Sequence, residues 1–249
     1  MLYLGPRAVQ PVSTATDYAR RNWQHYYQQQ AMSSSHPLLR QFYAKGMVQS
    51  DSPISEVPLL ALDIETTGLD PNTNGIVSIG LTPMTSNYIA SSKAKQWLVK
   101  PRFALNARSV TLHGITHTTI ANAPDLTDIL PEFLAALAGN VVVVHHAGIE
   151  RPFLHAALSA RFGEGIYFPI IDTMALEARL QRQKPLSWWQ KLRRQPATSI
   201  RLADSRLRYG LPPYRPHHAV TDALACAELL QAQLAHHFSP NTAVNTLWC

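Results

Sequence analysis

Residues 59–68 read LLALDIETTG, an apolar run that ends in two acidic residues. The run is bounded by Pro58 and Gly68, and its length and composition are typical of a buried strand. Asp63 and Glu65 are two residues apart, so both carboxylates project from the same face of that strand. Two like charges at the edge of a core are unfavourable unless a cation neutralises them. The pair alone fits equally well a site for Mg²⁺ or Mn²⁺ and an ordinary solvated strand end.

The rest of the chain alternates between the periodicities of strands and helices. Apolar runs predict further strands at 76–82, 88–99, 141–144 and 167–171. Helical spacing predicts helices at 125–138, 150–162, 202–209 and 219–236, and one more that Asp172 could cap. Three strands followed by alternating helices and strands indicate an α/β fold, with a mixed five-stranded sheet flanked by helices.

Changes in composition divide the chain into three parts. Residues 1–55 are rich in aromatic residues and glutamine and form a predicted N-terminal helical extension, which could pack on the domain or on a partner. Residues 56–238 form the predicted domain, and residues 239–249 a C-terminal tail. Within the domain, residues 182–200 read as an irregular basic insertion.

The composition excludes several classes of protein. The chain of 249 residues is 46% hydrophobic and 15% charged, which is incompatible with disorder of the whole chain. Its two cysteines cannot form a disulfide framework, so the reducing cytoplasm is the expected compartment. No run is long and apolar enough to cross a membrane, and we expect no membrane association. The formal net charge of +6 is compatible with a polyanionic partner such as nucleic acid.

Two further segments combine histidine with an acid. Residues 145–150 read HHAGIE and lead from a strand into a helix, where the helix dipole by itself favours Glu150. Residues 217–222 read HHAVTD. His217 lies in the predicted loop before the last helix and suits a general base, whereas His218 is four residues from Asp222 and could pair with it on the helix surface. Spacing alone does not choose between the two histidines.

Taken together, these segments resemble the DnaQ-like, DEDDh group of 3′–5′ exonucleases, which has a ribonuclease H-like fold. Residues 63–68 are similar to the first motif of that family, and His217 with Asp222 to its third. The segments 112–116 and 171–173 also resemble recurring family segments. The resemblance covers residues 57–236 with the motifs in order, but it includes neither the N-terminal extension nor the insertion.

The resemblance implies a metal-dependent 3′–5′ exonuclease that acts on single-stranded nucleic acid, with DNA favoured over RNA, and releases nucleoside 5′-monophosphates. Two divalent ions, Mg²⁺ or Mn²⁺, would support in-line displacement at the phosphate. The implied metal ligands and catalytic residues are Asp63, Glu65, Glu150 and Asp222, with His217 as the general base; the implied substrate-binding residues are Thr66, Thr67, Leu69 and His113.

The second motif departs from the family pattern. The second motif of the family carries Asn after its histidine and Asp five residues after it, whereas this chain has His146 and Glu150. The alternative is therefore a catalytically weak or silent nucleic-acid-binding module. A third interpretation keeps the chemistry but changes the substrate to short RNA or tRNA ends. A polymerase or another protein could dock through the extension, and Trp188, Trp189, Lys191, Arg193 and Arg194 of the insertion could contact a single strand.

Overall fold

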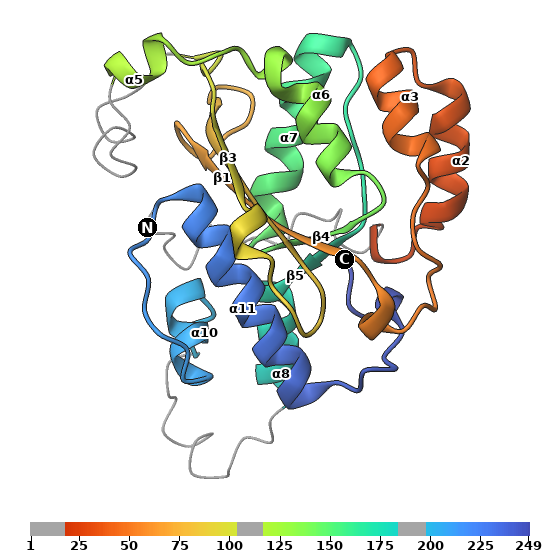
Figure 1. Ribbon diagram of the computed structural model, residues 1–249, viewed down its shortest axis with the longest axis vertical. Coiled ribbons are helices and arrows are strands. Elements are labelled where there is room, and N and C mark those ends of the chain that lie inside the picture. The colour runs from red at the N-terminus through yellow and green to blue at the C-terminus, as the bar shows by residue number, and fades with distance from the viewer. Residues whose placement is uncertain (1–17, 104–116, 184–197) are drawn as a thin grey trace.

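The computed structural model describes residues 18–103, 117–183 and 198–249 (Figure 1). Its strands are β1 (Leu59–Thr66), β2 (Ile76–Met84), β3 (Lys95–Leu98), β4 (Val141–Val144) and β5 (Ile170–Asp172). Its α-helices are α2 (Trp23–Ser33), α3 (Pro37–Ala44), α5 (His117–Ala121), α6 (Leu126–Leu137), α7 (Ala147–Phe162), α8 (Thr173–Gln183), α10 (Leu202–Arg208) and α11 (Ala219–His237). Short 3₁₀ turns lie at Ile54–Glu56, Ser91–Lys93 and Val244–Thr246.

The strands form one mixed sheet in the order β3-β2-β1-β4-β5. The pairs β1–β2 and β2–β3 are antiparallel, whereas β1–β4 and β4–β5 are parallel. This arrangement confirms the predicted mixed five-stranded sheet. The strand with the two acids, β1, lies at the centre, and its register places Asp63 opposite Gly80 and Glu65 opposite Ser78 of β2.

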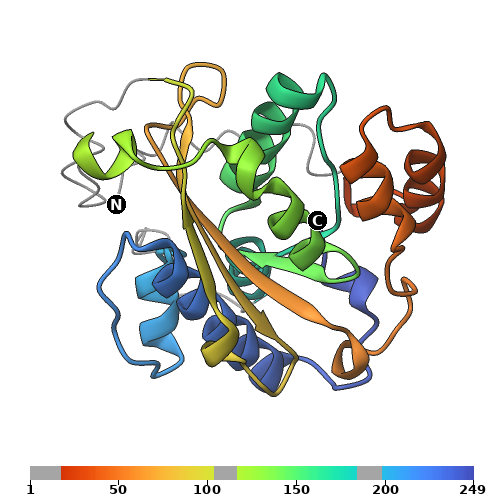
Figure 2. The same cartoon turned by 45° about the horizontal axis from the view of Figure 1, so that its top comes forward.

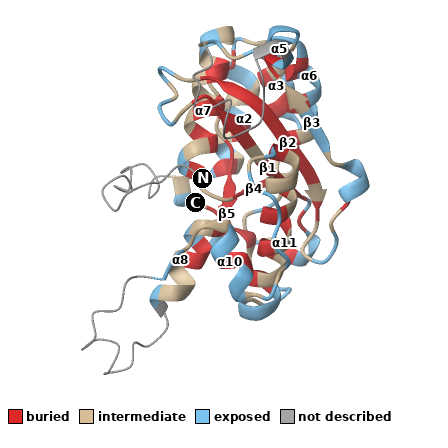
Figure 3. Cartoon of the chain, turned by 90° about the vertical axis from the view of Figure 1, so that its left-hand side faces the viewer, coloured by how far each residue is buried: buried red, intermediate tan, exposed pale blue. Residues whose placement is uncertain are grey.

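Helices cover both faces of the sheet. In Figure 2 the sheet runs diagonally between α10 and α11, coloured blue below it, and α6 and α7, coloured green above it. Helix α11 lies across β1 and β2, the two longest strands. Figure 3 shows β1, β2 and β4 almost entirely buried, so the core lies on both sides of these strands.

Most of the predicted elements are present, although two strands are shorter than predicted. The strand predicted at 88–99 is reduced to β3, because a 3₁₀ turn at Ser91–Lys93 precedes it. The strand predicted at 167–171 begins only at Ile170. Capping agrees with the sequence patterns: Asp125 and Asp128 form a capping box at the start of α6, and Gly163 ends α7 with a φ of 75°.

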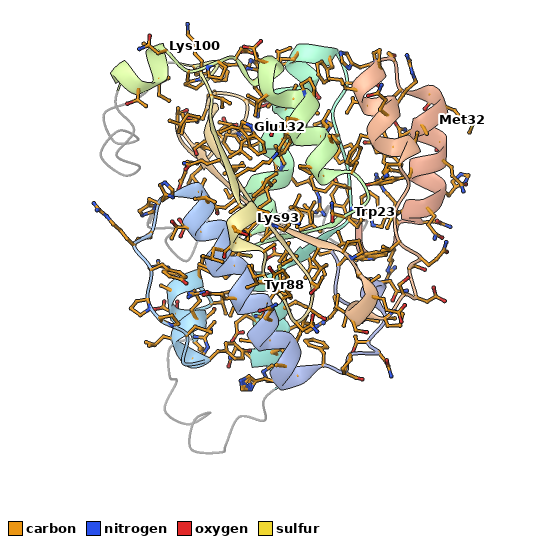
Figure 4. The ribbon with its side chains drawn as sticks, viewed as in Figure 1. Trp23, Met32, Tyr88, Lys93, Lys100 and Glu132 are labelled. Carbon is orange, nitrogen blue, oxygen red and sulfur yellow. The ribbon has the colours of Figure 1, made fainter. Side chains whose placement is uncertain are left out.

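The N-terminal helices α2 and α3 pack on the domain. Tyr27 and Tyr43 face each other edge to face with ring centroids 5.0 Å apart, and the Tyr43 hydroxyl accepts a hydrogen bond of 3.0 Å from the amide of Tyr167. The buried Trp23 belongs to the same apolar core as the sheet. Met32, by contrast, points away from the molecule at the outer side of α2 (Figure 4) and is 81% exposed.

The segment predicted as a C-terminal tail is tied into the fold. Ala243 forms a β-bridge with Pro53, and Trp248 forms one with Ile171 of β5. Val244 and Trp248 are buried. Among the described residues, no helix combines the length and the apolar character needed to cross a bilayer.

Candidate active site

Three carboxylates from two elements meet at the end of the central strand. Asp63 and Glu65 come from β1, and Asp222 comes from the first turn of α11. One ligand oxygen of each lies within 4.8 Å of those of the other two, and they form the carboxylate cluster of this site. The alternation of side chains along β1 puts its two acids on one face, as the sequence predicts.

A glycine in β2 allows the helix to approach the strand closely enough for this meeting. Gly80 pairs with Asp63 across the β1–β2 ladder. A Cβ built on Gly80 would lie 2.2 Å from the carbonyl carbon of Ala219, the first residue of α11. No side chain fits there, so the start of α11 rests directly on the backbone of β2. Sequence reasoning did not single out Gly80, although a glycine inside a strand pattern is a signal of close backbone contact.

Glu150 lies beside the cluster but outside the group of three. It is 4% exposed in the first turn of α7, and its Oε2 atom has no hydrogen-bond partner. Burial raises the pKa of Glu150 well above its usual value, and the charges of Asp172 and Glu65 add to that effect. A buried carboxylate oxygen that accepts no hydrogen bond destabilises the folded protein.

The same crowding affects the other acids of the site. Burial raises the pKa of Asp63 well above its usual value, and the neighbouring charges of Glu65, Glu150 and Asp222 raise it further. The pKa of Asp222 is also raised by burial, although the backbone amide of His217 opposes that shift. No cationic group offsets these charges strongly enough to return either pKa to its usual value.

These residues fit a divalent cation. The cluster consists of hard carboxylate oxygens from β1 and α11, and Glu150 of α7 adds a nearby buried oxygen that lacks a donor. A cation among them would remove the repulsion that raises the pKa values of Asp63 and Asp222. The described part of the chain offers no second cluster of three or more metal-ligating side chains.

Asp172 has a structural role. Its Oδ1 accepts hydrogen bonds from the amides of His146, Met174 and Ala175, at 3.1, 2.9 and 3.2 Å, and its Oδ2 accepts one of 2.9 Å from the amide of Ala147. One carboxylate therefore caps the starts of both α7 and α8. The prediction that Asp172 caps a helix is confirmed, and the structure extends it to two helices.

The two histidines before α7 have different surroundings. His145 is held by Thr173, whose Oγ1 lies 2.8 Å from its Nδ1, and by the carbonyl of Ile200, 3.1 Å from its Nε2. Burial lowers the pKa of His145 to about 4, so the ring is neutral at physiological pH. His146 is the N-cap residue of α7 and has a φ of 116°.

The two histidines before α11 differ in their contacts. His217 lies in the loop, and its backbone amide donates a hydrogen bond of 2.7 Å to Oδ2 of Asp222. His218 is the N-cap residue of α11, is exposed, and has its Nδ1 3.1 Å from the hydroxyl of Thr221. Within the described ranges, His146 and His217 are the only residues other than glycine with positive φ. His146 lies one residue before α7 and His217 two residues before α11, the helices that carry Glu150 and Asp222, and such strain commonly marks functional sites.

The loop after β1 is built by the predicted substrate-binding threonines. The Thr66 hydroxyl donates a hydrogen bond of 2.6 Å to the carbonyl of Gly68, and the Thr67 hydroxyl accepts one of 3.0 Å from the amide of Gly75. Leu69 is 42% exposed, so it is not an ordinary core residue. His113 and the aromatic and basic residues of the insertion (184–197) lie outside the described residues.

Comparison with known proteins matches the chain to the exonuclease family over residues 60–230. DNA polymerase III PolC-type from Thermotoga petrophila is 31% identical over 180 residues, which make up 72% of this chain but only 12% of that protein. DNA polymerase III subunit epsilon from Treponema pallidum is 28% identical over 185 residues, or 74% of this chain and 80% of that protein.

A solved structure with a similar fold is the nuclease domain of 3′hExo, a DEDDh family member bound to rAMP. Its TM-score is 0.57 at 15% identity, and the match covers 76% of this chain and 96% of that domain. The chain therefore shares the fold of that nuclease domain.

Proposed function

The chain belongs to the exonuclease family, and on that premise we propose that it is a metal-dependent 3′–5′ exonuclease. It removes nucleotides from single-stranded 3′ ends and releases nucleoside 5′-monophosphates. The observation that carries this proposal is the approach of Asp63, Glu65 and Asp222 to within 4.8 Å, beside a buried Glu150 oxygen that lacks a partner. Such a group is unfavourable in the empty protein and suited to hold divalent cations.

Two divalent ions, Mg²⁺ or Mn²⁺, would be held by Asp63, Glu65, Glu150 and Asp222. When bound, they would supply the charge that activates water and stabilises the leaving 3′ oxygen. The protein's contribution is to hold the acids in place before substrate arrives. Gly80 fixes the distance between β1 and α11, and Asp172 fixes the start of α7.

His217 is the proposed general base. Its backbone amide is bonded to Asp222, so its position is linked to the carboxylate cluster. A neutral imidazole takes a proton from the attacking water and later returns it to solvent. His145 cannot serve, because both of its ring nitrogens are occupied by Thr173 and Ile200.

The loop after β1 is the proposed binding site of the terminal nucleotide. Thr66 and Thr67 hold the loop in shape through their hydroxyls, and the exposed Leu69 offers an apolar contact for a base. His113 is proposed to contribute as well. The relatives named as subunits of DNA polymerase III favour DNA, and the net charge of +6 favours a polyanion of either kind. Association with a polymerase through residues 1–55 is part of the same proposal.

The test is digestion of a single-stranded DNA oligonucleotide labelled at its 5′ end, with a matched RNA oligonucleotide beside it. We expect stepwise shortening from the 3′ end in Mn²⁺ or Mg²⁺, and none in EDTA. Asp63→Ala should reduce the rate by about 10²–10³-fold or more, because it removes a group that helps to stabilise the transition state. Full activity in that variant, or release of 3′-phosphates, would contradict the proposal.

A second candidate function is a nucleic-acid-binding module without turnover. One observation favours it: Glu150 lies outside the cluster of three carboxylates, at the position where the family carries Asp. This candidate predicts salt-sensitive binding of oligonucleotides and no release of nucleotides. Glu150→Asp should then create activity in a protein that has none, whereas an active wild type excludes it.

A further inference from the structure

A buried arginine on α10 anchors the loop that leads into α11. Arg206, on α10, is 3% exposed. Its Nη1 donates to the carbonyl of Ala225 at 2.7 Å, and its Nη2 donates to the carbonyl of Pro212 at 2.8 Å and to Oε2 of Glu228 at 2.7 Å. One guanidinium thus connects α10, α11 and residue 212 of the loop, using the fixed fork that only arginine provides.

Tyr214 adds a second point of attachment two residues further along. Its ring lies over the guanidinium of Arg206, with 4.6 Å between the ring centroid and Cζ. Its hydroxyl donates a hydrogen bond of 2.8 Å to Oε1 of Glu228. The carboxylate of Glu228 therefore accepts from Arg206 with one oxygen and from Tyr214 with the other. Arg206, Tyr214 and Glu228 together are the loop anchor.

The loop above the anchor has little else to hold it. Residues 212–216 are all exposed, and three of them are prolines. Proline has no amide hydrogen to donate, so this stretch cannot be fixed by regular backbone hydrogen bonds. Between Tyr214 and His217, Pro216 has a fixed φ and so restricts the short connection that joins them. A displacement at Tyr214 is therefore expected to affect the position of His217.

We propose that the Arg206–Tyr214–Glu228 anchor positions His217 for the reaction. This inference rests on the proposed function, since it assigns the anchor a role in setting the place of the general base. Arg206, Tyr214 and Glu228 are positioning residues and act through His217, whose amide is bonded to Asp222 at the other end of the connection. Both ends of the segment 214–217 are thereby fixed, one on the anchor and one on the carboxylate cluster.

The experiment compares Tyr214→Ala with the wild type in digestion of labelled single-stranded DNA. We expect kcat to fall by about 10- to 100-fold with little change in KM, because a small misplacement of a reacting group is costly. Tyr214→Phe keeps the ring over Arg206, and Arg206→Lys keeps the charge, so both should give smaller losses. The matched control is Tyr88→Ala, which removes a tyrosine that is 63% exposed in the connection between β2 and β3 (Figure 4) and should leave kcat unchanged.

A double-mutant cycle separates positioning from contact with the substrate. If Tyr214 acts through His217, adding Tyr214→Ala to His217→Gln should change the remaining rate by less than about twofold. If Tyr214 instead stacks on a base, Tyr214→Ala will raise KM, and this increase will also be seen in the His217→Gln background. That outcome, or an unchanged kcat in Tyr214→Ala, would overturn the proposal.

Hydrogen exchange tests the anchor without activity. The amide of His217 should exchange faster in Tyr214→Ala and Arg206→Lys than in the wild type, while amides of β1 should not change. A wild type without nuclease activity would refute the proposed function, and the exchange data would still test the anchor. An active wild type whose His217 amide exchanges equally in all variants would refute the anchor alone.

Discussion

Glu150 and Glu177 are both buried carboxylates on helices, but their surroundings are opposite. Oε1 of Glu177 accepts from Gln181 at 2.6 Å and from Arg208 at 3.1 Å, and its Oε2 accepts from Tyr209 at 3.1 Å and Gln233 at 3.0 Å. Burial acts to raise the pKa of Glu177, yet these bonds outweigh it and the pKa lies below the usual value. Glu150 has an Oε2 without a partner and a raised pKa.

This difference distinguishes a carboxylate that stabilises the fold from one that is available to bind a ligand. The partners of Glu177 come from α8, α10 and α11, so this carboxylate joins three helices. Glu150 lies near other acids, and burial together with those acids outweighs the nearby charge of Arg151, so that the pKa of Glu150 stays raised. Structural carboxylates stabilise through partners that are already present, whereas the carboxylates of a binding site keep capacity for a ligand.

The largest expected effect on stability is from Glu177→Ala. Removing this carboxylate leaves the exposed Arg208, the half-buried Tyr209 and the buried Gln233 without their shared acceptor. Each buried group that loses its partner typically costs about 1–3 kcal/mol. Urea denaturation should show this loss in the free energy of unfolding. If Glu177→Ala left the free energy of unfolding unchanged, Glu177 and Glu150 would not differ in the way described.

The response to metal should come next in size. Mn²⁺ at 100 times its dissociation constant should stabilise the wild type by about 2.7 kcal/mol, because it binds only the folded state. Thermal unfolding with Mn²⁺ and with EDTA measures this difference. Asp63→Asn should lose most of the shift, whereas Tyr88→Ala should keep it. An equal shift in wild type and Asp63→Asn would place the cation elsewhere.

Gly80→Ala should affect the acidic site more than the helix junction around Glu177. The added methyl would collide with the backbone of Ala219 and push the start of α11, with Asp222, away from β1. Overpacking of this kind costs about 1–3 kcal/mol, and we expect the stabilisation by Mn²⁺ to be reduced as well.

The matched control for Gly80→Ala is Gly163→Ala. Gly163 ends α7 with a φ of 75° and open space around its Cα, so alanine there strains only the backbone. This variant should lose about 1 kcal/mol of stability and keep the full response to Mn²⁺. If Gly80→Ala left the stabilisation by Mn²⁺ unchanged, the position of α11 would not control metal binding.

The smallest expected effect is a gain in stability from Glu150→Gln in EDTA at pH 8. Because the folded-state pKa of Glu150 is raised, the unfolded chain loses this proton first as the pH rises, and the wild type is progressively destabilised. Below the unfolded pKa of about 4.3 the carboxyl is protonated in both states and the gain should vanish. Denaturation between pH 4 and pH 8 checks the sign; a Gln variant that is less stable at pH 8 would contradict it.

Local patterns in the sequence predict most of the fold. The strand at 141–144 and the start of the last helix at Ala219 are confirmed to the residue, because long apolar runs and a helix preceded by a loop are local signals. The strand predicted at 88–99 is too long, since the turn at Ser91–Lys93 is not marked by glycine or proline. Neither the pairing of strands nor the docking of α2 and α3 follows from local periodicity.

The candidate site could be predicted in its members but not in its geometry. The motifs name Asp63, Glu65 and Asp222, and the structure brings these three together. Arg206 and Glu228 carried no such signal, because a charged residue at helical spacing is typical of a solvated face. Their burial depends on contacts between elements that are distant in the sequence.

The double cap formed by Asp172 has a consequence for local unfolding. Because one carboxylate accepts from amides at the starts of both α7 and α8, a movement of Asp172 disturbs the caps of both helices together. The beginnings of these two helices should therefore open as a single cooperative unit, with matched protection factors. The backbone that supports Glu150 is thus held by Asp172 of β5, a strand that contributes no acid to the cluster.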